Sequence, residues 1–237
     1  MTQELTIKVY ADGAEIDKMV AAYETGKITG FTTNPSLMKK AGITSYTDFA
    51  KAALEKITDL PISFEVFADD FETMEKEAEK IASFGKNVYV KIPITNTKGE
   101  SAVPLIKKLS EKGLSLNVTA ILTIQQVEET VAAFKEGTTN IVSVFAGRAA
   151  DTGVDPMPLM KASAKECHTK PGTELLWASS REVLNIFQAQ EAGADIITCT
   201  PEIINKMSMI GMDLNELSLD TVRMFNRDIK TLGYSIL

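Results

Sequence analysis

The sequence predicts an α/β protein, a single (β/α)8 TIM barrel over residues 1–237 that ends in a C-terminal helix. Eight short runs rich in Val, Ile, Phe and Thr recur at intervals of roughly thirty residues, as the strands of such a barrel do. Stretches with helical spacing of apolar residues lie between nearly all of them. The length of 237 residues suits one barrel, and no linker rich in Pro, Gly or Ser divides the chain.

The first element of the pattern is the strand, and the alternation of strand with helix implies a parallel sheet. An open doubly wound sheet is the alternative arrangement. No GxGxxG motif follows the first run and no GxxxxGK[ST] motif occurs, so the nucleotide-binding forms of that alternative lack their phosphate loop. The predicted strands are Thr6 to Ala11, Ile28 to Thr33, Ile62 to Ala68, Val88 to Ile94, Leu114 to Leu122, Asn140 to Gly147, Glu174 to Ser179 and Ala194 to Cys199.

The second element is the amphipathic helix, seen most clearly from Phe71 to Ala82, where apolar residues recur every three or four positions and charges cover the other face. Glycines that follow helical patterns are expected to end them in the left-handed conformation, at positions 85, 113, 137 and 193. The other predicted helices are Tyr46 to Ile57, Ile124 to Phe134, Met157 to Glu166, Arg181 to Ala192 and, last in the chain, Leu217 to Leu232.

Composition argues against several classes of function. A net charge of −7 and a pI near 5.0 argue against nucleic acid as a partner, because phosphate-backbone binding needs a clustered basic face. No apolar run approaches membrane-spanning length, and the first residues lack a signal-peptide pattern, so we expect a cytoplasmic protein without a membrane partner. Two distant cysteines, Cys167 and Cys199, and a single histidine, His168, disfavour a metal site or a histidine base.

Lys91 is the most informative residue, because it lies inside Asn87 to Ile94, which otherwise reads as a buried strand. Burial favours loss of the proton from an unpaired lysine, and a neutral lysine is a nucleophile toward carbonyl carbon. The strand therefore indicates Schiff-base chemistry. The alternative is that Lys91 extends into solvent from a strand end.

Polar residues end or interrupt most of the other predicted strands. Singly, each is an ordinary turn former. In a barrel, however, the carboxyl ends of the strands converge on one face, which is where barrel active sites lie. The candidates are Asp12, Asn34, Glu65, Lys91, Asn117, Thr119, Ser143 and Ser179.

Arginine is scarce in this chain, and two of the four arginines follow strands directly. Arg148 follows one strand and Arg181 the next. Guanidinium groups on one face of a barrel suit bidentate binding of a phosphate, so the pair indicates a phosphorylated substrate. For either arginine alone, a surface salt bridge is the competing interpretation.

Five segments together resemble the transaldolases, in the short branch shared with the fructose-6-phosphate aldolases. They are Gly30 to Ser36 (GFTTNPS), Val90 to Pro93 (VKIP), Leu116 to Thr119 (LNVT), Ser143 to Arg148 (SVFAGR) and Ala178 to Arg181 (ASSR). The resemblance spans the chain in the right order and implies a (β/α)8 barrel that needs no metal or organic cofactor. It departs from the family at Gly13, where Thr or Ser usually follows the aspartate, so it does not imply the hydrogen bonding around Asp12.

The resemblance also implies roles for individual residues. Lys91 is the Schiff-base lysine, Asp12 is the carboxylate that moves a proton, and Glu65 with Thr119 holds a catalytic water. The substrate-binding set comprises Asn34 and Asn117 for the substrate hydroxyls and the imine, Ser143 for the dihydroxyacetone end, Arg148, Arg181 and Ser179 for the phosphate, together with Thr33 and Phe145.

Two positions favour transfer of the dihydroxyacetone unit to an acceptor over its release. The aldolases resemble one another in having Gln where this chain has Glu65 and Tyr where it has Phe145. We therefore expect a transaldolase of the pentose phosphate pathway, which moves a dihydroxyacetone unit from sedoheptulose 7-phosphate or fructose 6-phosphate to an aldose phosphate. A fructose-6-phosphate aldolase that releases dihydroxyacetone and a non-catalytic sugar-phosphate-binding barrel are the alternatives. Short-branch relatives are oligomeric, so we expect a homo-oligomer in which residues 217–237 pack on a neighbouring subunit.

Overall fold

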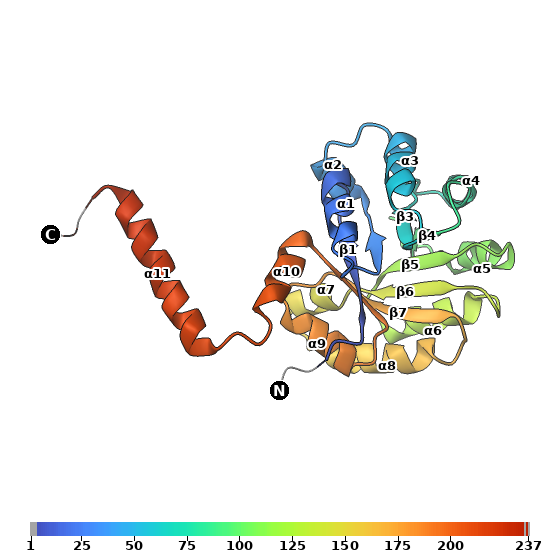
Figure 1. The fold of residues 1–237 in the computed structure, drawn as a ribbon. Helices are drawn as coiled ribbons and strands as arrows, with labels where there is room; N and C mark the ends of the chain where they lie inside the picture. Colours follow the sequence, from blue (N-terminus) through green and yellow to red (C-terminus); the bar gives the residue numbers. More distant parts are fainter. Residues whose placement is uncertain (1–3, 235, 237) are drawn as a thin grey trace.

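A computed structural model describes residues 4–234 and 236, and within them eight parallel strands close into a barrel in chain order, as predicted (Figure 1). Residues 1–3 of the expected domain, and residues 235 and 237 of the expected C-terminal contact, lie outside the described residues. The strands are β1 (Lys8–Asp12), β2 (Gly30–Thr32), β3 (Ile62–Glu65), β4 (Val88–Pro93), β5 (Leu116–Ile121), β6 (Asn140–Val144), β7 (Thr173–Trp177) and β8 (Ile196–Cys199).

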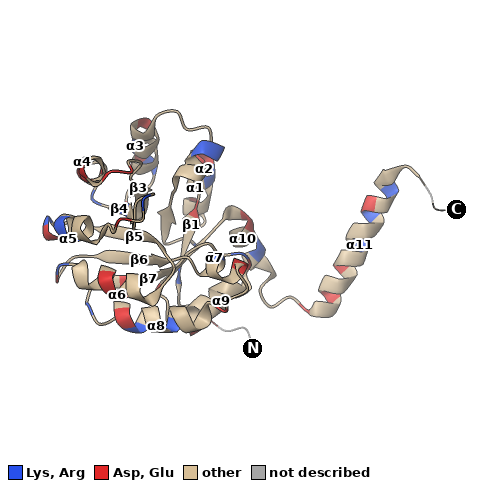
Figure 2. Cartoon of the chain, turned by 180° about the vertical axis from the view of Figure 1, so that it is seen from behind, with Lys and Arg blue, Asp and Glu red and all other residues tan. Residues whose placement is uncertain are grey.

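Helices follow the strands and cover the outside of the barrel (Figure 1). Most charged residues lie on these helices (Figure 2). The helices of the chain are α1 (Ile16–Glu24), α2 (Pro35–Lys40), α3 (Tyr46–Lys56), α4 (Phe71–Ala82), α5 (Val103–Glu111), α6 (Ile124–Ala133), α7 (Ala146–Asp151), α8 (Met157–Cys167), α9 (Leu184–Glu191), α10 (Pro201–Lys206), the 3-10 turn η1 (Met207–Met209) and α11 (Leu214–Leu232). No helix formed by the described residues is long and apolar enough to cross a membrane.

Local chemistry explains where the helices begin and end. The carboxylate of Asp213 accepts hydrogen bonds from the backbone N–H groups of Asn215 and Glu216. Helix α11 therefore begins at Leu214, before the expected start. Helix α9 begins later than expected because the side chain of Asn185 accepts hydrogen bonds from the N–H groups of Arg181 and Glu182, which turns that segment away from the helix. Glycines 113, 137 and 193 have φ of +82° to +83° as predicted. Gly85 does not have a positive φ, and that prediction is wrong: Ser83 and Phe84 already close the end of α4 with turn hydrogen bonds.

The barrel interior changes character along its axis. Tyr10, Ile141, Leu176 and Ile196 pack together in the interior, and Tyr10, Ile141 and Ile196 each come two residues before a polar residue on the same strand, Asp12, Ser143 and Thr198 respectively. Further along, the register places Asp12 beside Thr32, Glu65 beside Lys91, and Lys91 beside Asn117. Because side chains alternate along a strand, these residues also face inward. The sequence thus forms an apolar base with a polar layer above it.

Helix α11 differs from the others, because it extends away from the barrel (Figure 1) and none of its residues is buried. Its large apolar side chains recur every three to four positions and are exposed, and they include Val222, Phe225, Ile229 and Leu232. A stripe of this kind normally packs against another element.

Candidate active site

A cavity of about 530 Å³ opens at the carboxyl ends of the strands and brings together all but three of the predicted site residues. The three that do not line it are Thr33, Asn117 and Arg181. Those that do are Asp12, Asn34, Glu65, Lys91, Thr119, Ser143, Phe145, Arg148 and Ser179, together with Thr32, Ala120 and Thr198, which the sequence did not indicate.

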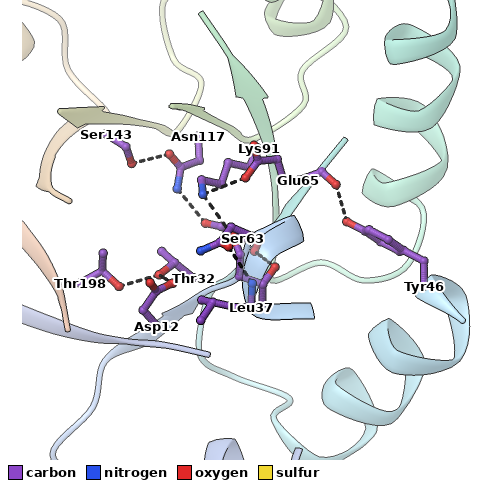
Figure 3. A network of polar contacts seen from close by, with 12 residues as sticks. Asp12, Thr32, Leu37, Tyr46, Ser63, Glu65, Lys91, Asn117, Ser143 and Thr198 are labelled. Carbon is purple, nitrogen blue, oxygen red and sulfur yellow. Dashed lines mark hydrogen bonds and ion pairs between the residues drawn. The ribbon is translucent and has the colours of Figure 1, made fainter. Parts of the chain in front are cut away.

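Lys91 lies in the wall of this cavity and is only 6% exposed. Its Nζ is 3.0 Å from Oε2 of Glu65 and donates a hydrogen bond of 3.2 Å to the carbonyl of Thr33 (Figure 3). The alternative in which Lys91 extends into solvent is therefore wrong. Glu65 is thus the ion-pair partner of Lys91 and lies within reach of a proton on Nζ. Its own strand end is held by the hydroxyl of Tyr46, which donates to the Glu65 carbonyl at 2.7 Å.

Asp12 ends β1, lines the same cavity as Lys91 and is hydrogen-bonded from β2. The hydroxyl of Thr32 donates to Oδ1 of Asp12 at 2.8 Å, and the Thr198 hydroxyl of β8 is 2.5 Å from that of Thr32 (Figure 3). Burial raises the pKa of the Asp12 carboxyl, while Lys91 and the Thr32 hydrogen bond oppose the shift and Glu65 adds to it. The carboxylate is thus more basic than an exposed aspartate.

Two residues that were predicted to bind substrate lie beneath the cavity surface. Asn117 is fully buried, accepts a hydrogen bond from Ser143 at 2.7 Å and donates to the Ser63 hydroxyl at 2.9 Å (Figure 3). Thr33 is also fully buried, and its hydroxyl donates to the Ser63 carbonyl. Successive side chains point to opposite sides of a strand, so Thr32 rather than Thr33 faces the cavity. The pairing of Thr32 with Asp12 across two strands is the signal that sequence reasoning lacked.

Two further cavity residues show how backbone and side chain are arranged for a ligand. Asn34 accepts a hydrogen bond from the N–H of Leu37 and so caps α2 at the cavity edge. The hydroxyl of Thr119 is buried and has no hydrogen-bond partner among the described residues. The next residue, Ala120, has φ of +62° where the pairing of β5 with β6 shifts register. An unsatisfied buried hydroxyl beside a strained backbone is a common mark of a functional position.

The opposite rim of the cavity carries the arginines. Arg148 lies over the ring of Phe145, with its guanidinium carbon 5.5 Å from the ring centre. Ser179 has φ of +60°, and its carbonyl lies so close to Gly147 that a Cβ at position 147 would be 1.6 Å from it. Only glycine fits there, so Gly147 allows the first turn of α7 to contact the turn after β7.

Arg181 lies outside the lining and forms a two-point ion pair with Asp151 at the end of α7. Both side chains are about half exposed. The hydrogen bond from Arg181 lowers the pKa of the Asp151 carboxyl. Among the described residues, no group of three or more His, Cys, Asp and Glu side chains is arranged to hold a metal ion.

Comparison with known proteins agrees with the geometry. Residues 9–236 match the model of the family described as transaldolase/fructose-6-phosphate aldolase. A protein of Ruegeria sp. (strain TM1040) named probable transaldolase is 35% identical over 98% of this chain and 100% of its own length. Proteins with the same name from Sphingopyxis alaskensis and Nitrosopumilus maritimus are 39% and 32% identical, over 84% and 94% of this chain and 88% and 100% of their own lengths. The chain belongs to the transaldolase/fructose-6-phosphate aldolase family.

Proposed function

We propose that this enzyme transfers a dihydroxyacetone unit from a ketose phosphate, sedoheptulose 7-phosphate or fructose 6-phosphate, to an aldose phosphate through a Schiff base on Lys91, in the pentose phosphate pathway. The observation that carries the proposal is Lys91 itself, 6% exposed in the cavity wall and 3.0 Å from Glu65. The names of the relatives, probable transaldolase, support the same activity.

The first half of the cycle forms the imine. Lys91 must lose a proton before its amine can attack the C2 ketone, and Glu65 is within reach of that proton. The resulting carbinolamine loses water to give an iminium ion. Glu65 and Thr119 hold this water, a role supported by the Thr119 hydroxyl in the cavity wall, which has no hydrogen-bond partner in the described part of the chain.

The second half breaks the carbon chain. Asp12 takes the proton of the C4 hydroxyl, the C3–C4 bond breaks, and its electrons move into the iminium to give an enamine on Lys91. The aldose phosphate leaves, an acceptor aldehyde enters and the steps reverse. Because the iminium is the electron sink, the cycle uses no cofactor. The raised pKa of Asp12 suits a group that accepts and returns a proton.

The remaining residues bind the substrate. Arg148 and Ser179 hold the phosphate at the rim of the cavity, and Arg181 joins them by exchanging Asp151 for the phosphate. Asn34 and Ser143 contact substrate hydroxyls. Asn117 contributes by holding Ser143, and Thr33 by its backbone carbonyl, which accepts from Lys91.

Borohydride trapping tests the proposal directly. Incubation with fructose 6-phosphate and borohydride is expected to fix a reduced dihydroxyacetone adduct on Lys91, detected by peptide mass spectrometry, and to abolish activity. Lys91→Met should neither be labelled nor turn over. Lys98→Met, which removes an exposed lysine from the loop that follows the same strand, is the matched control and should behave as wild type. Labelling of another lysine in the wild type would move the site elsewhere.

The fructose-6-phosphate aldolase alternative differs in one product. If Glu65 and Phe145 favour transfer, free dihydroxyacetone should not accumulate from fructose 6-phosphate until an acceptor is supplied. Its steady release without acceptor, measured by a coupled dehydrogenase assay, would establish the aldolase. Saturable sugar binding with no product by mass spectrometry would instead establish the non-catalytic barrel.

The exposed stripe of α11 supports a homo-oligomer of single-domain cytoplasmic subunits, in which α11 packs on a neighbouring copy of this chain. Sedimentation should give an oligomer for the wild type and a monomer for the double variant Phe225→Asp/Ile229→Asp. Arg227→Asp, on the opposite side of the same helix, is the control and should leave the oligomer intact. A wild-type monomer at micromolar concentration would contradict the proposal.

A further inference from the structure

Two threonines of the cavity wall have no part in the cycle described above, although they lie next to the proposed base. Thr32 and Thr198 are 2% and 6% exposed and belong to β2 and β8, the two strands that flank β1. Thr32 pairs with Asp12 across the β1–β2 ladder, and Thr198 pairs with Tyr10 across the β1–β8 ladder. Their hydroxyls form a row with the carboxylate of Asp12 (Figure 3).

The direction of this row follows from hydrogen-bonding capacity. An ionised carboxylate has only acceptors, so Thr32 must donate its one hydroxyl hydrogen to Oδ1 of Asp12 across 2.8 Å. With that hydrogen committed, the contact of 2.5 Å between the two threonines requires Thr198 to be the donor. The hydrogen bonds therefore run from Thr198 to Thr32 to Asp12. The bond that Thr198 donates polarises the Thr32 hydroxyl and so strengthens the hydrogen bond from Thr32 to the carboxylate.

We propose that Thr32 and Thr198 are positioning residues that act through Asp12, as a directed chain of two hydroxyls that stabilises the carboxylate and leaves Oδ2 free to face the substrate. This inference rests on the proposed function only in giving Asp12 the role of base. The hydrogen bond is strongest when Asp12 is ionised and weakens when the carboxyl accepts a proton, so the chain opposes the effect of burial. Thr198 contributes only through Thr32.

Other groups around Asp12 act in both directions. Lys91 favours the ionised form, and Glu65 disfavours it. Cys199 lies beside Thr198 on β8, and burial together with the Asp12 charge keeps its thiol protonated, with a pKa of about 11. A second groove bordered by Asp12 is also lined by Glu15, Lys18, Lys40 and Glu202. None of these groups is removed by a change at Thr32 or Thr198, so the two threonines can be tested while the charges stay in place.

The test is a double-mutant cycle read by the titration of Asp12. Thr32→Val removes the hydroxyl at nearly constant volume, Thr32→Ser keeps it, and Thr198→Val removes the second link. The ¹³C resonance of the Asp12 carboxyl, assigned by its loss in Asp12→Asn, is followed against pH in enzyme without substrate. The acid limb of kcat/KM for fructose 6-phosphate is measured in parallel.

We expect Thr32→Val to raise the proton affinity of Asp12 about tenfold, as loss of a hydrogen bond to a charged group does. Thr198→Val should raise it about threefold, Thr32→Ser should restore the wild-type value, and the double variant should match Thr32→Val alone. The acid limb of kcat/KM should move to higher pH by the same amounts.

An unchanged titration in both valine variants would overturn the inference, and so would additive shifts in the double variant, because Thr198 would then act independently of Thr32. If Thr32→Val does not fold, Thr198→Val alone decides, since a purely packing role predicts no shift of the carboxyl titration. The titration requires no turnover. A shifted resonance in a protein without transaldolase activity would therefore reject the proposed function and support the hydroxyl chain.

Discussion

Two groups of polar residues at the cavity differ in their surroundings. One is a largely buried polar ring, which we define as the cavity residues Asp12, Thr32, Glu65, Lys91 and Ser143 with Asn117 beneath them. The other is a more exposed cationic rim, defined as Arg148 and Ser179 of the cavity lining with the pair of Arg181 and Asp151 outside it. Each contains an ion pair: the side chains of Lys91 and Glu65 are 8% and 16% exposed, whereas those of Arg181 and Asp151 are 49% and 53% exposed.

The difference in exposure suits the ring and the rim to different functions. The side chains of the ring hold one another by hydrogen bonds and an ion pair, so neighbouring groups set their positions. At the rim, solvent screens the charges, and one anion can exchange for another with little loss of free energy. The ring suits covalent and proton-transfer steps, while the rim suits reversible binding of a charged group.

The largest expected effect comes from breaking the pair in the ring. Lys91→Met should remove turnover entirely and lower the free energy of unfolding by roughly 3 kcal/mol, because it leaves the Glu65 carboxylate buried without its cation. Arg181→Met removes the cation of the rim pair and should lower the free energy of unfolding by about 1 kcal/mol or less. Chemical denaturation of both variants measures the contrast, and equal losses would remove the distinction between ring and rim.

The next effect concerns Asp12, the proposed general base in the ring. Asp12→Asn should reduce kcat by a factor of about 10² to 10⁴, as loss of a general base does. It should also stabilise the protein near neutral pH. The pKa of Asp12 is raised on folding, so its favourable contribution is present below the unfolded pKa of about 4 and is lost as pH rises through the folded pKa.

Calorimetry at two pH values checks this sign. The gain in Tm from Asp12→Asn should be larger at pH 7 than at pH 4, because ionising a buried carboxyl lowers stability progressively as the pH rises. A gain that grows as the pH falls would mean that the carboxyl is stabilised in its ionised form and that the ring does not raise its pKa.

A smaller effect is expected at the rim. Arg148→Ala should raise KM for phosphorylated sugars about tenfold or more, since a charge-assisted hydrogen bond is lost, and should change the use of unphosphorylated sugars little. Arg181→Ala should act in the same direction and more weakly, because in the proposed complex Arg181 must first leave Asp151 to reach the phosphate. Equal losses toward both sugar classes, in steady-state kinetics, would rule out the phosphate role.

The smallest effect is that of salt. Raising KCl from about 0.05 M to about 0.5 M shortens the screening length severalfold, so KM for a phosphorylated sugar should rise a fewfold. The rate of borohydride trapping at saturating substrate should stay constant, because the ring is screened mainly by protein. A trapping rate that falls with salt in parallel would show that solvent reaches the ring.

Much of this arrangement could be predicted from local sequence. The strand and helix periods, with turn chemistry between them, predict the barrel, and the helix Phe71–Ala82 has the predicted bounds because its cap, Asp70, and its apolar stripe are adjacent in sequence. Lys91 was identifiable because a charge inside an apolar strand requires an explanation wherever the strand lies.

What sequence reasoning missed depends on contacts between distant segments. Thr33 and Asn117 share motifs with cavity residues but bind Ser63 beneath the surface, and Arg181 binds Asp151. The contacts of Thr32 depend on the register between β1 and β2 and on Thr198 from the far end of the chain. Nothing near these residues in sequence encodes such pairings.

The sequence by itself determined that this chain is an alternating parallel barrel with a buried lysine and polar strand ends, because periodicity and the penalty for burying charge act over a few residues. Only the tertiary structure decided which polar side chains reach the cavity, which hold one another beneath it, and which charge pairs remain in contact with solvent. Burial and hydrogen-bond partners depend on neighbours from distant segments, such as Thr198, which barrel closure brings beside β1 by joining it to β8.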